Sequence, residues 1–147
     1  MENDVVLNEE QLFGDGSKPI VEPVTVARLG GKVLVSELDS RLAILVDQET
    51  HEPLPGGRRQ IKQDGLYNAR WLAATVRRPD GSRMFTINDG PEAGATLPPG
   101  VNVKPLFDQA QLEKLAKLPT PISEKLLEVA LRLNSILPEA VDAAAKN

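Results

Sequence analysis

The only histidine of the chain, His51, carries the side chain best suited to acid–base or metal chemistry at neutral pH. The carboxylates nearest to it in the sequence are Asp47, Glu49 and Glu52. A zinc site normally has several His or Cys ligands at fixed spacing, whereas this chain has one His and no Cys. We therefore interpret the segment as a polar loop, and the sequence predicts neither a metal nor a cofactor.

No other group of residues has the spacing of a catalytic site. A serine nucleophile needs a base, and the single histidine falls in the predicted loop. The carboxylates fall mainly on faces predicted to be solvent-exposed, where nothing raises a pKa. The Gly14-Asp15-Gly16 stretch lacks the spacing of a phosphate-binding loop, and no apolar strand precedes it. We therefore expect a protein that is not an enzyme. An unrelated small enzyme is kept as an alternative, behind the two binding and structural roles given below.

Length and composition restrict the class of protein. The 147 residues are 41% hydrophobic but only 3% aromatic, so we expect a single aliphatic core. A net charge of −4 argues against nucleic acid as the main partner. No stretch approaches the ~20 apolar residues of a membrane span. The start of the chain, Met1-Glu2-Asn3-Asp4, has no basic or apolar leader, so we expect no signal peptide and a cytoplasmic location.

The N-terminal third predicts an arm followed by a hairpin. Residues 1–19 are mostly polar, and we interpret them as a flexible arm before a single domain over residues 20–147. In that domain, two β-rich runs, 24–29 and 32–35, flank Gly30-Gly31. Glycines supply the positive φ of tight turns, so this pattern predicts an antiparallel hairpin with a two-residue loop. An isolated hairpin is only marginally stable, so it must rest on other elements.

The middle of the chain predicts two helices. Ser36-Glu37-Leu38-Asp39 resembles a capping box and is followed by helical apolar spacing to about Gln48, although the run 42–46 also fits a buried strand. Residues 49–63 are predicted to be a connection, because they contain several prolines and glycines. Apolar spacing then predicts a second helix over residues 66–77.

The last part of the chain predicts further helices. Residues 84–87 suggest a short strand, and 88–105 have the composition of a long loop. Asp108 is placed to cap a helix to about residue 117, and Thr120 with Pro121 to begin another to about residue 134. A final helix is predicted over 138–146. The fold class is therefore α+β, mainly helical with four to five helices, and with a small antiparallel hairpin sheet near the N-terminus.

Four apolar residues are the candidates for contact with a partner protein. Tyr67 and Trp71 are the only Tyr and Trp, lie four residues apart on a predicted helix, and belong to the types that dominate binding hot spots. Leu126 and Leu133 lie on the apolar face of the helix that begins near Thr120. That face is wide enough to need a cover, from either this chain or a partner. Packing in the core is the alternative for all four.

The order of these segments resembles the tail assembly chaperones of long-tailed bacteriophages and prophages. The resemblance covers about residues 24–147 and lacks a catalytic signature. The residues that carry it are Lys32-Val33-Leu34-Val35-Ser36-Glu37-Leu38, Asn68-Ala69-Arg70-Trp71-Leu72-Ala73-Ala74-Thr75-Val76 running into Pro79-Asp80-Gly81-Ser82-Arg83-Met84-Phe85-Thr86, Gln111-Leu112-Glu113-Lys114-Leu115, Leu126-Leu127-Glu128-Val129-Ala130-Leu131-Arg132-Leu133-Asn134-Ser135 and Lys146-Asn147. In the family, the segment that matches residues 79–86 leads almost directly into an acidic helix, whereas residues 87–105 intervene in this chain.

This resemblance implies a non-enzymatic role. Such chaperones bind the long helical tape-measure protein and keep it soluble while the tail assembles. In many relatives a translational frameshift adds a domain that recruits tail tube protein. The implied location is the cytoplasm of a bacterial host and not the mature virion, and self-association is expected. The alternative is a structural component of the tail or head–tail junction that stays in the virion.

Overall fold

A computed structural model of the chain describes residues 5–94 and 104–135, so the helix predicted over 138–146 lies outside the described residues. The α-helices among these residues are α1 (Glu9–Leu12), α2 (Ser40–Thr50), α3 (Tyr67–Thr75), α4 (Gln109–Ala116) and α5 (Thr120–Leu133). The strands are β1 (Val21–Val26), β2 (Gly31–Ser36), β3 (His51–Pro53), β4 (Arg59–Ile61) and β5 (Val76–Arg77). Three 3₁₀ turns are η1 (Asp15–Ser17), η2 (Ala27–Leu29) and η3 (Pro55–Gly57).

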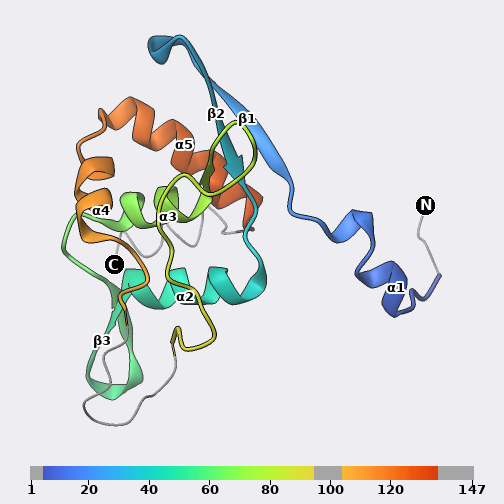
Figure 1. Cartoon of the computed structure of the whole chain (residues 1–147). Helices are drawn as coiled ribbons and strands as arrows, with labels where there is room; N and C mark the ends of the chain where they lie inside the picture. Colours follow the sequence, from blue (N-terminus) through green and yellow to red (C-terminus); the bar gives the residue numbers. More distant parts are fainter. Residues whose placement is uncertain (1–4, 95–103, 136–147) are drawn as a thin grey trace.

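Helix α3 forms the centre of the folded body. Figure 1 shows it between α2 and α5, with α4 beside it, and it contacts all three helices. Every residue from Ala69 to Thr75 is buried, as expected for a helix that is apolar on all sides. Three of these residues are alanines, which let the neighbouring helices approach closely, and Trp71 and Leu72 fill the core between them. The body is therefore organised around α3.

The three-stranded sheet has the order β1-β2-β5 and is antiparallel throughout. Its register pairs Val21 with Ser36 and Val35 with Val76, so the hairpin is joined to the segment that leaves α3. The predicted hairpin is present, but its loop is Ala27–Gly30 and not Gly30-Gly31. Of these two glycines, only Gly30 has a positive φ, of 77°, whereas a type I′ two-residue loop needs positive φ at both central residues.

Several predicted element ends were wrong. The N-cap of α2 is Asp39, whose side chain accepts from the Leu42 N–H at 2.8 Å, while Ser36 ends β2. The segment 42–46 is helical, which excludes the strand alternative. The predicted second helix ends at Thr75, because Val76–Arg77 pairs with β2. Thr120 is the first residue of α5 and not its cap, which is Pro119.

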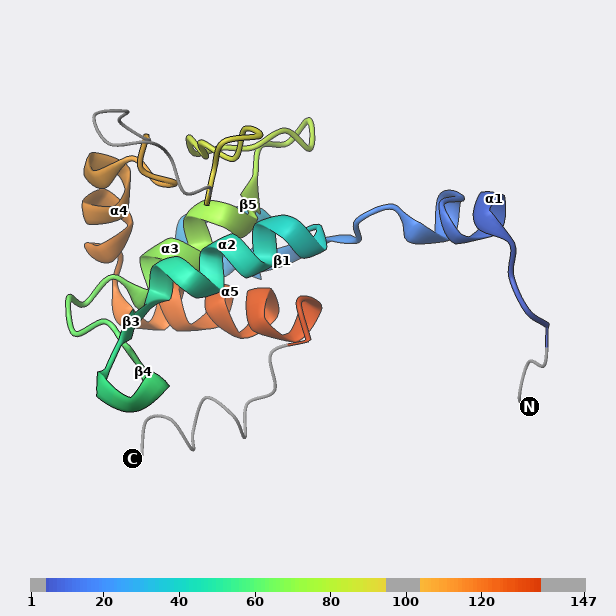
Figure 2. The same cartoon turned by 90° about the horizontal axis from the view of Figure 1, so that it is seen from below.

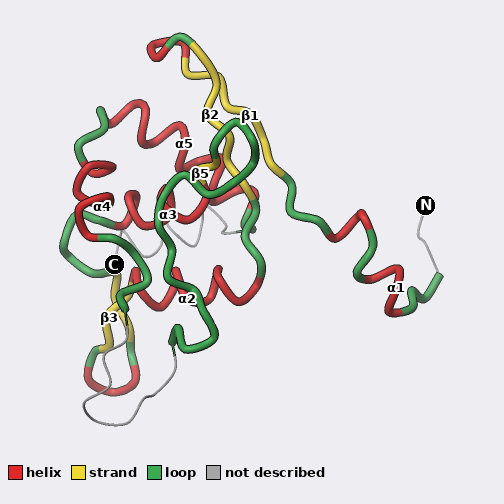
Figure 3. The backbone as a smooth tube through the Cα atoms, viewed as in Figure 1, coloured by secondary structure: helices red, strands yellow, loops and turns green. Residues whose placement is uncertain are grey.

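The fold is a mixed α+β arrangement, as predicted, but strands also occur outside the N-terminal hairpin and helices do not clearly dominate (Figure 3). The segment 49–63, predicted to be a connection, contains the antiparallel pair β3–β4. Its strands are three residues long and contain polar residues and Pro, so they have no apolar alternation to mark them. Residues 84–87 form no strand and contribute one isolated bridge, between Ile87 and Phe107.

The two ends of the predicted 88–105 loop lie together. The Asn88 N–H donates to the Leu106 carbonyl at 2.9 Å, beside the bridge between Ile87 and Phe107. The Arg41 guanidinium of α2 donates to the carbonyl of Asp89 at 2.6 Å, which holds the first part of the loop against the body. Residues 95–103 are outside the described residues. The division into an arm over 1–19 and one domain over 20–147 stays a prediction.

No helix among residues 5–94 and 104–135 is long and apolar enough to cross a membrane.

Candidate partner-binding groove

An apolar groove opens between the hairpin, the loop after β5, helix α4 and the first half of α5. It has a volume of about 480 Å³. Val76, Ile122 and Leu126 are buried residues that line its floor. Leu29 and Met84 line it from the rim, with exposed fractions of 58% and 38%. The remaining lining residues are Val33, Phe85, Gln111, Lys114, Leu115 and Leu118, and these eleven residues define the groove.

Local hydrogen bonds fix the walls of the groove. The left-handed backbone of Gly30, which closes the hairpin, places Leu29 at the hairpin end. On the opposite wall, the Gln111 side-chain oxygen of α4 accepts from the Thr86 N–H at 2.8 Å. This bond ties the loop that carries Phe85 to α4, where Leu115 lines the same groove, as does Leu118 just after the helix. This wall of the groove therefore depends on a bond between residues that are 25 positions apart in the sequence.

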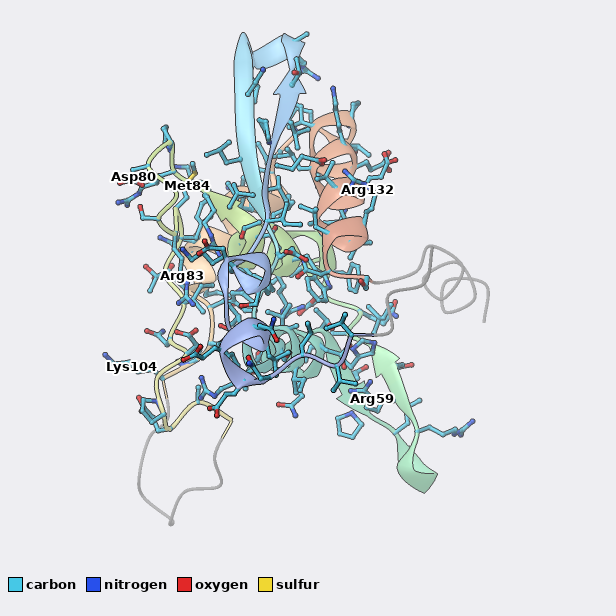
Figure 4. All side chains as sticks on the ribbon, turned by 90° about the vertical axis from the view of Figure 1, so that its right-hand side faces the viewer. Arg59, Asp80, Arg83, Met84, Lys104 and Arg132 are labelled. Atoms are coloured by element: carbon cyan, nitrogen blue, oxygen red, sulfur yellow. The ribbon has the colours of Figure 1, made fainter. Side chains whose placement is uncertain are left out.

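An ion pair joins the two parts of the loop that precede and follow Met84. The Arg83 guanidinium donates to both carboxylate oxygens of Asp89, at 2.8 and 2.7 Å. This bidentate contact lowers the pKa of Asp89 below its ordinary value, despite the opposing effect of burial. At the tip of the loop, Asp80 accepts from the backbone and hydroxyl of Ser82, and these bonds lower the pKa of Asp80. Figure 4 shows Asp80, Met84 and Arg83 along this loop.

The charged side chain that lines the groove is a cation. Lys114 is the one charged residue in its lining, which contains no carboxylate. Lys117 follows on the same helix end, and Arg28 and Lys32 flank the hairpin residues that line the groove. None of these four cations has a carboxylate within salt-bridge distance among the described residues. The groove thus suits a partner segment that combines apolar and acidic side chains.

The four residues predicted to contact a partner are not brought together on one surface. Trp71 is 2% exposed and lies in the core with its indole N–H buried. Tyr67 is half-buried, and burial raises its pKa, while the nearby Trp71 opposes that shift. Leu126 is 3% exposed, but it lines the groove floor. Leu133 is half-buried against the core. Only Leu126 therefore contributes to the groove.

The rest of the groove was missed from the sequence. Leu29 gave no signal, because it was assigned to the end of the strand run 24–29, where an apolar residue is ordinary; only the structure places it in the hairpin loop. Phe85 and Leu115 gave none, since each was consistent with ordinary core packing. The groove forms only when the hairpin, the loop and two helices meet.

His51 is part of a local network at the end of α2. Its Nδ1 lies 2.8 Å from the Asp47 carbonyl oxygen and 2.8 Å from the Thr50 hydroxyl. Within the described ranges, no three His, Cys, Asp or Glu side chains are grouped to hold a metal ion. The imidazole is thus engaged in joining α2 to β3, which begins at this residue.

Comparison of the chain with models of known families, with curated proteins and with solved structures found no match.

Proposed function

We propose that this chain is a non-enzymatic binding protein that covers an apolar stripe of a helical partner in the groove. The observation that carries the proposal is the groove itself, an apolar recess with a volume of about 480 Å³ that is open to solvent at Leu29 and Met84. Recessed apolar surfaces that bind amphipathic helices are a common mode of recognition. A partner whose apolar stripe is exposed would aggregate without such a cover.

The resemblance described above suggests which partner this is. We propose the tape-measure protein of a long-tailed phage or prophage, which this chain would keep soluble in the cytoplasm of the bacterial host during tail assembly. On this proposal the chain leaves before the virion is complete. A frameshifted extension that recruits tail tube protein belongs to the same proposal.

Co-expression with the tape-measure protein encoded beside the gene tests the proposal. We expect a soluble complex that holds several copies of this chain per partner. Leu29→Glu and Met84→Glu place a carboxylate at the groove rim and are expected to weaken the complex at least tenfold. Ile44→Glu is the matched control, because Ile44 is also 58% exposed but lies on α2, outside the groove. An insoluble tape-measure protein in the presence of this chain would contradict the proposal.

A structural component of the tail or head–tail junction is the second candidate. The observation in its favour is the N-terminal segment, which leads away from the body and carries exposed apolar residues (Figures 1 and 2). Tail proteins that remain in the virion can join their neighbours through such arms. Mass spectrometry of purified virions separates the two candidates, because only the structural component is retained there.

A further inference from the structure

The segment 5–20, called here the N-terminal arm, exposes apolar side chains that the body leaves uncovered. Val6 is 93% exposed and Phe13 74%, while Leu7 and Leu12 are each more than half exposed. Figures 1 and 2 show the arm leading away from the body in two perpendicular views. Exposed apolar residues that cluster in one short segment mark an interaction site.

The arm nevertheless has local order. Asn8 and Gln11 form a reciprocal capping box, in which each side chain accepts from the other residue's N–H at 3.0 Å. The Phe13 N–H donates to the Glu9 carbonyl at 3.1 Å and closes the single turn of α1. A helix this short is only marginally stable alone in water, so an apolar surface on which it packs would stabilise it.

The groove matches the arm in charge and in chemistry. The arm carries Glu9, Glu10 and Asp15 against the single cation Lys18, whereas the groove has Lys114 and no carboxylate. A cavity of about 150 Å³ holds one benzene ring. The groove volume of about 480 Å³ therefore suits about three apolar side chains of the arm.

The direction of the arm favours a second copy as the occupant. The Ile20 N–H donates to the Glu37 carboxylate at 2.7 Å, and the Glu37 N–H donates to the Ile20 carbonyl at 2.8 Å. These bonds hold the root of the arm at the base of the hairpin, near the end of α5, where Asn134 contacts β2. The groove lies toward the opposite end of α5, at Ile122 and Leu126. To reach the groove of its own chain, the arm would have to reverse its direction where these two hydrogen bonds hold Ile20.

We propose that the N-terminal arm of one copy docks, through Val6, Leu12 and Phe13, into the groove of a second copy. Reciprocal exchange closes a two-fold dimer, and exchange in one direction builds an open row of copies. In either assembly the groove is covered while no other partner is present. The inference concerns this chain alone and does not depend on the identity of the partner proposed above.

The absence of cysteine allows a direct test by cross-linking in the full chain. Leu12→Cys and Lys114→Cys are prepared as separate variants, mixed and oxidised mildly. We expect a disulfide between the two variants, because the arm of one copy lies beside Lys114 of the other. Arg58→Cys replaces Lys114→Cys as the control, since Arg58 is exposed near β4 and outside the groove. Equal cross-linking to both positions would overturn the proposal.

The double variant Leu12→Cys/Lys114→Cys distinguishes a second copy from the same chain. Linked dimers or larger species on a denaturing gel support the proposal. A product that is only an internally linked monomer would overturn it, because it would place the arm on its own body.

Sedimentation supplies a second readout that needs no cysteine. Phe13→Asp is expected to weaken self-association at least tenfold without a change in the far-ultraviolet circular dichroism of the body. Ile44→Asp, at another exposed apolar residue, is expected to leave it unchanged. Glu10→Lys and Lys114→Glu should each weaken association severalfold, and their combination should restore part of it. Unchanged association in Phe13→Asp would contradict the proposal.

Discussion

Helix α3 and the N-terminal arm use the same kinds of apolar side chain in opposite ways. In α3, which contacts three other helices, Trp71 and Leu72 are at most 2% exposed. In the arm, Val6 and Phe13 are exposed over most of their surface. Burial of apolar area stabilises the fold of the single chain, whereas exposed apolar area is available to another molecule. The comparison teaches that composition alone does not tell a stabilising residue from a binding residue.

The largest expected loss of stability comes from a truncation in α3. Trp71→Ala removes the largest buried side chain and should lower the free energy of unfolding by about 3–5 kcal/mol. Urea unfolding followed by circular dichroism measures the change. Phe13→Ala is the matched aromatic truncation in the arm, and it should change the free energy of unfolding by less than about 0.5 kcal/mol under dilute conditions. Equal losses in the two variants would contradict the comparison.

A smaller loss is expected where α5 joins the hairpin. The Asn134 side chain accepts from the Leu38 N–H at 2.7 Å and donates to the Ala130 carbonyl at 2.8 Å. Asn134→Ala leaves a partly buried N–H unpaired and should cost about 1–3 kcal/mol. Thermal unfolding measures this loss. Ser135→Ala, at the exposed neighbouring residue, is the control and should be nearly neutral.

The pair between Asp64 and Arg70 should make the stability of the body depend on acid. The buried Arg70 guanidinium donates to both Asp64 oxygens and holds the pKa of this carboxyl below its ordinary value of about 3.9. The unfolded chain then binds the proton more readily than the folded chain. The contribution of the pair is complete above the ordinary pKa and is lost as the pH falls below it.

Asp64→Asn isolates this contribution. Because Asp64 is 38% exposed, solvent screens the pair, and the loss at pH 7 should be about 1–2 kcal/mol. Unfolding measured at pH 7 and at pH 2.5 should show a smaller difference between the two proteins at the acid pH. A constant difference at both pH values would show that the charge of Asp64 is not the cause.

Sequence reasoning succeeded where a local signal decided the structure. Asp108 caps α4, as predicted, by accepting from the Gln111 N–H at 3.0 Å, because capping needs only a residue and its next turn. It failed at Thr120, whose hydroxyl makes no cap, and at Val76, where pairing with β2 overrides a helical pattern. Contacts between distant segments thus decide what a local pattern leaves open.

Prediction of the candidate site, the groove, has the same limit as prediction of the element ends. Leu126 was among the residues predicted from the apolar face of its helix, and it lines the groove floor. Trp71 has the side chain most typical of binding hot spots, yet it lies in the core, because the Ala-rich helix around it is enclosed on all sides. Met84 and Leu29 line one groove only after the hairpin and the loop have folded, so no window of sequence could link them.

The most direct test measures binding to the partner proposed above, the tape-measure protein, together with stability, in the same set of variants. Leu29→Glu and Met84→Glu change exposed rim residues and should alter the free energy of unfolding by less than about 0.5 kcal/mol. The account predicts that both variants lose the soluble complex while Ile44→Glu retains it. A complex that forms equally well with all three variants would contradict the groove as the binding site.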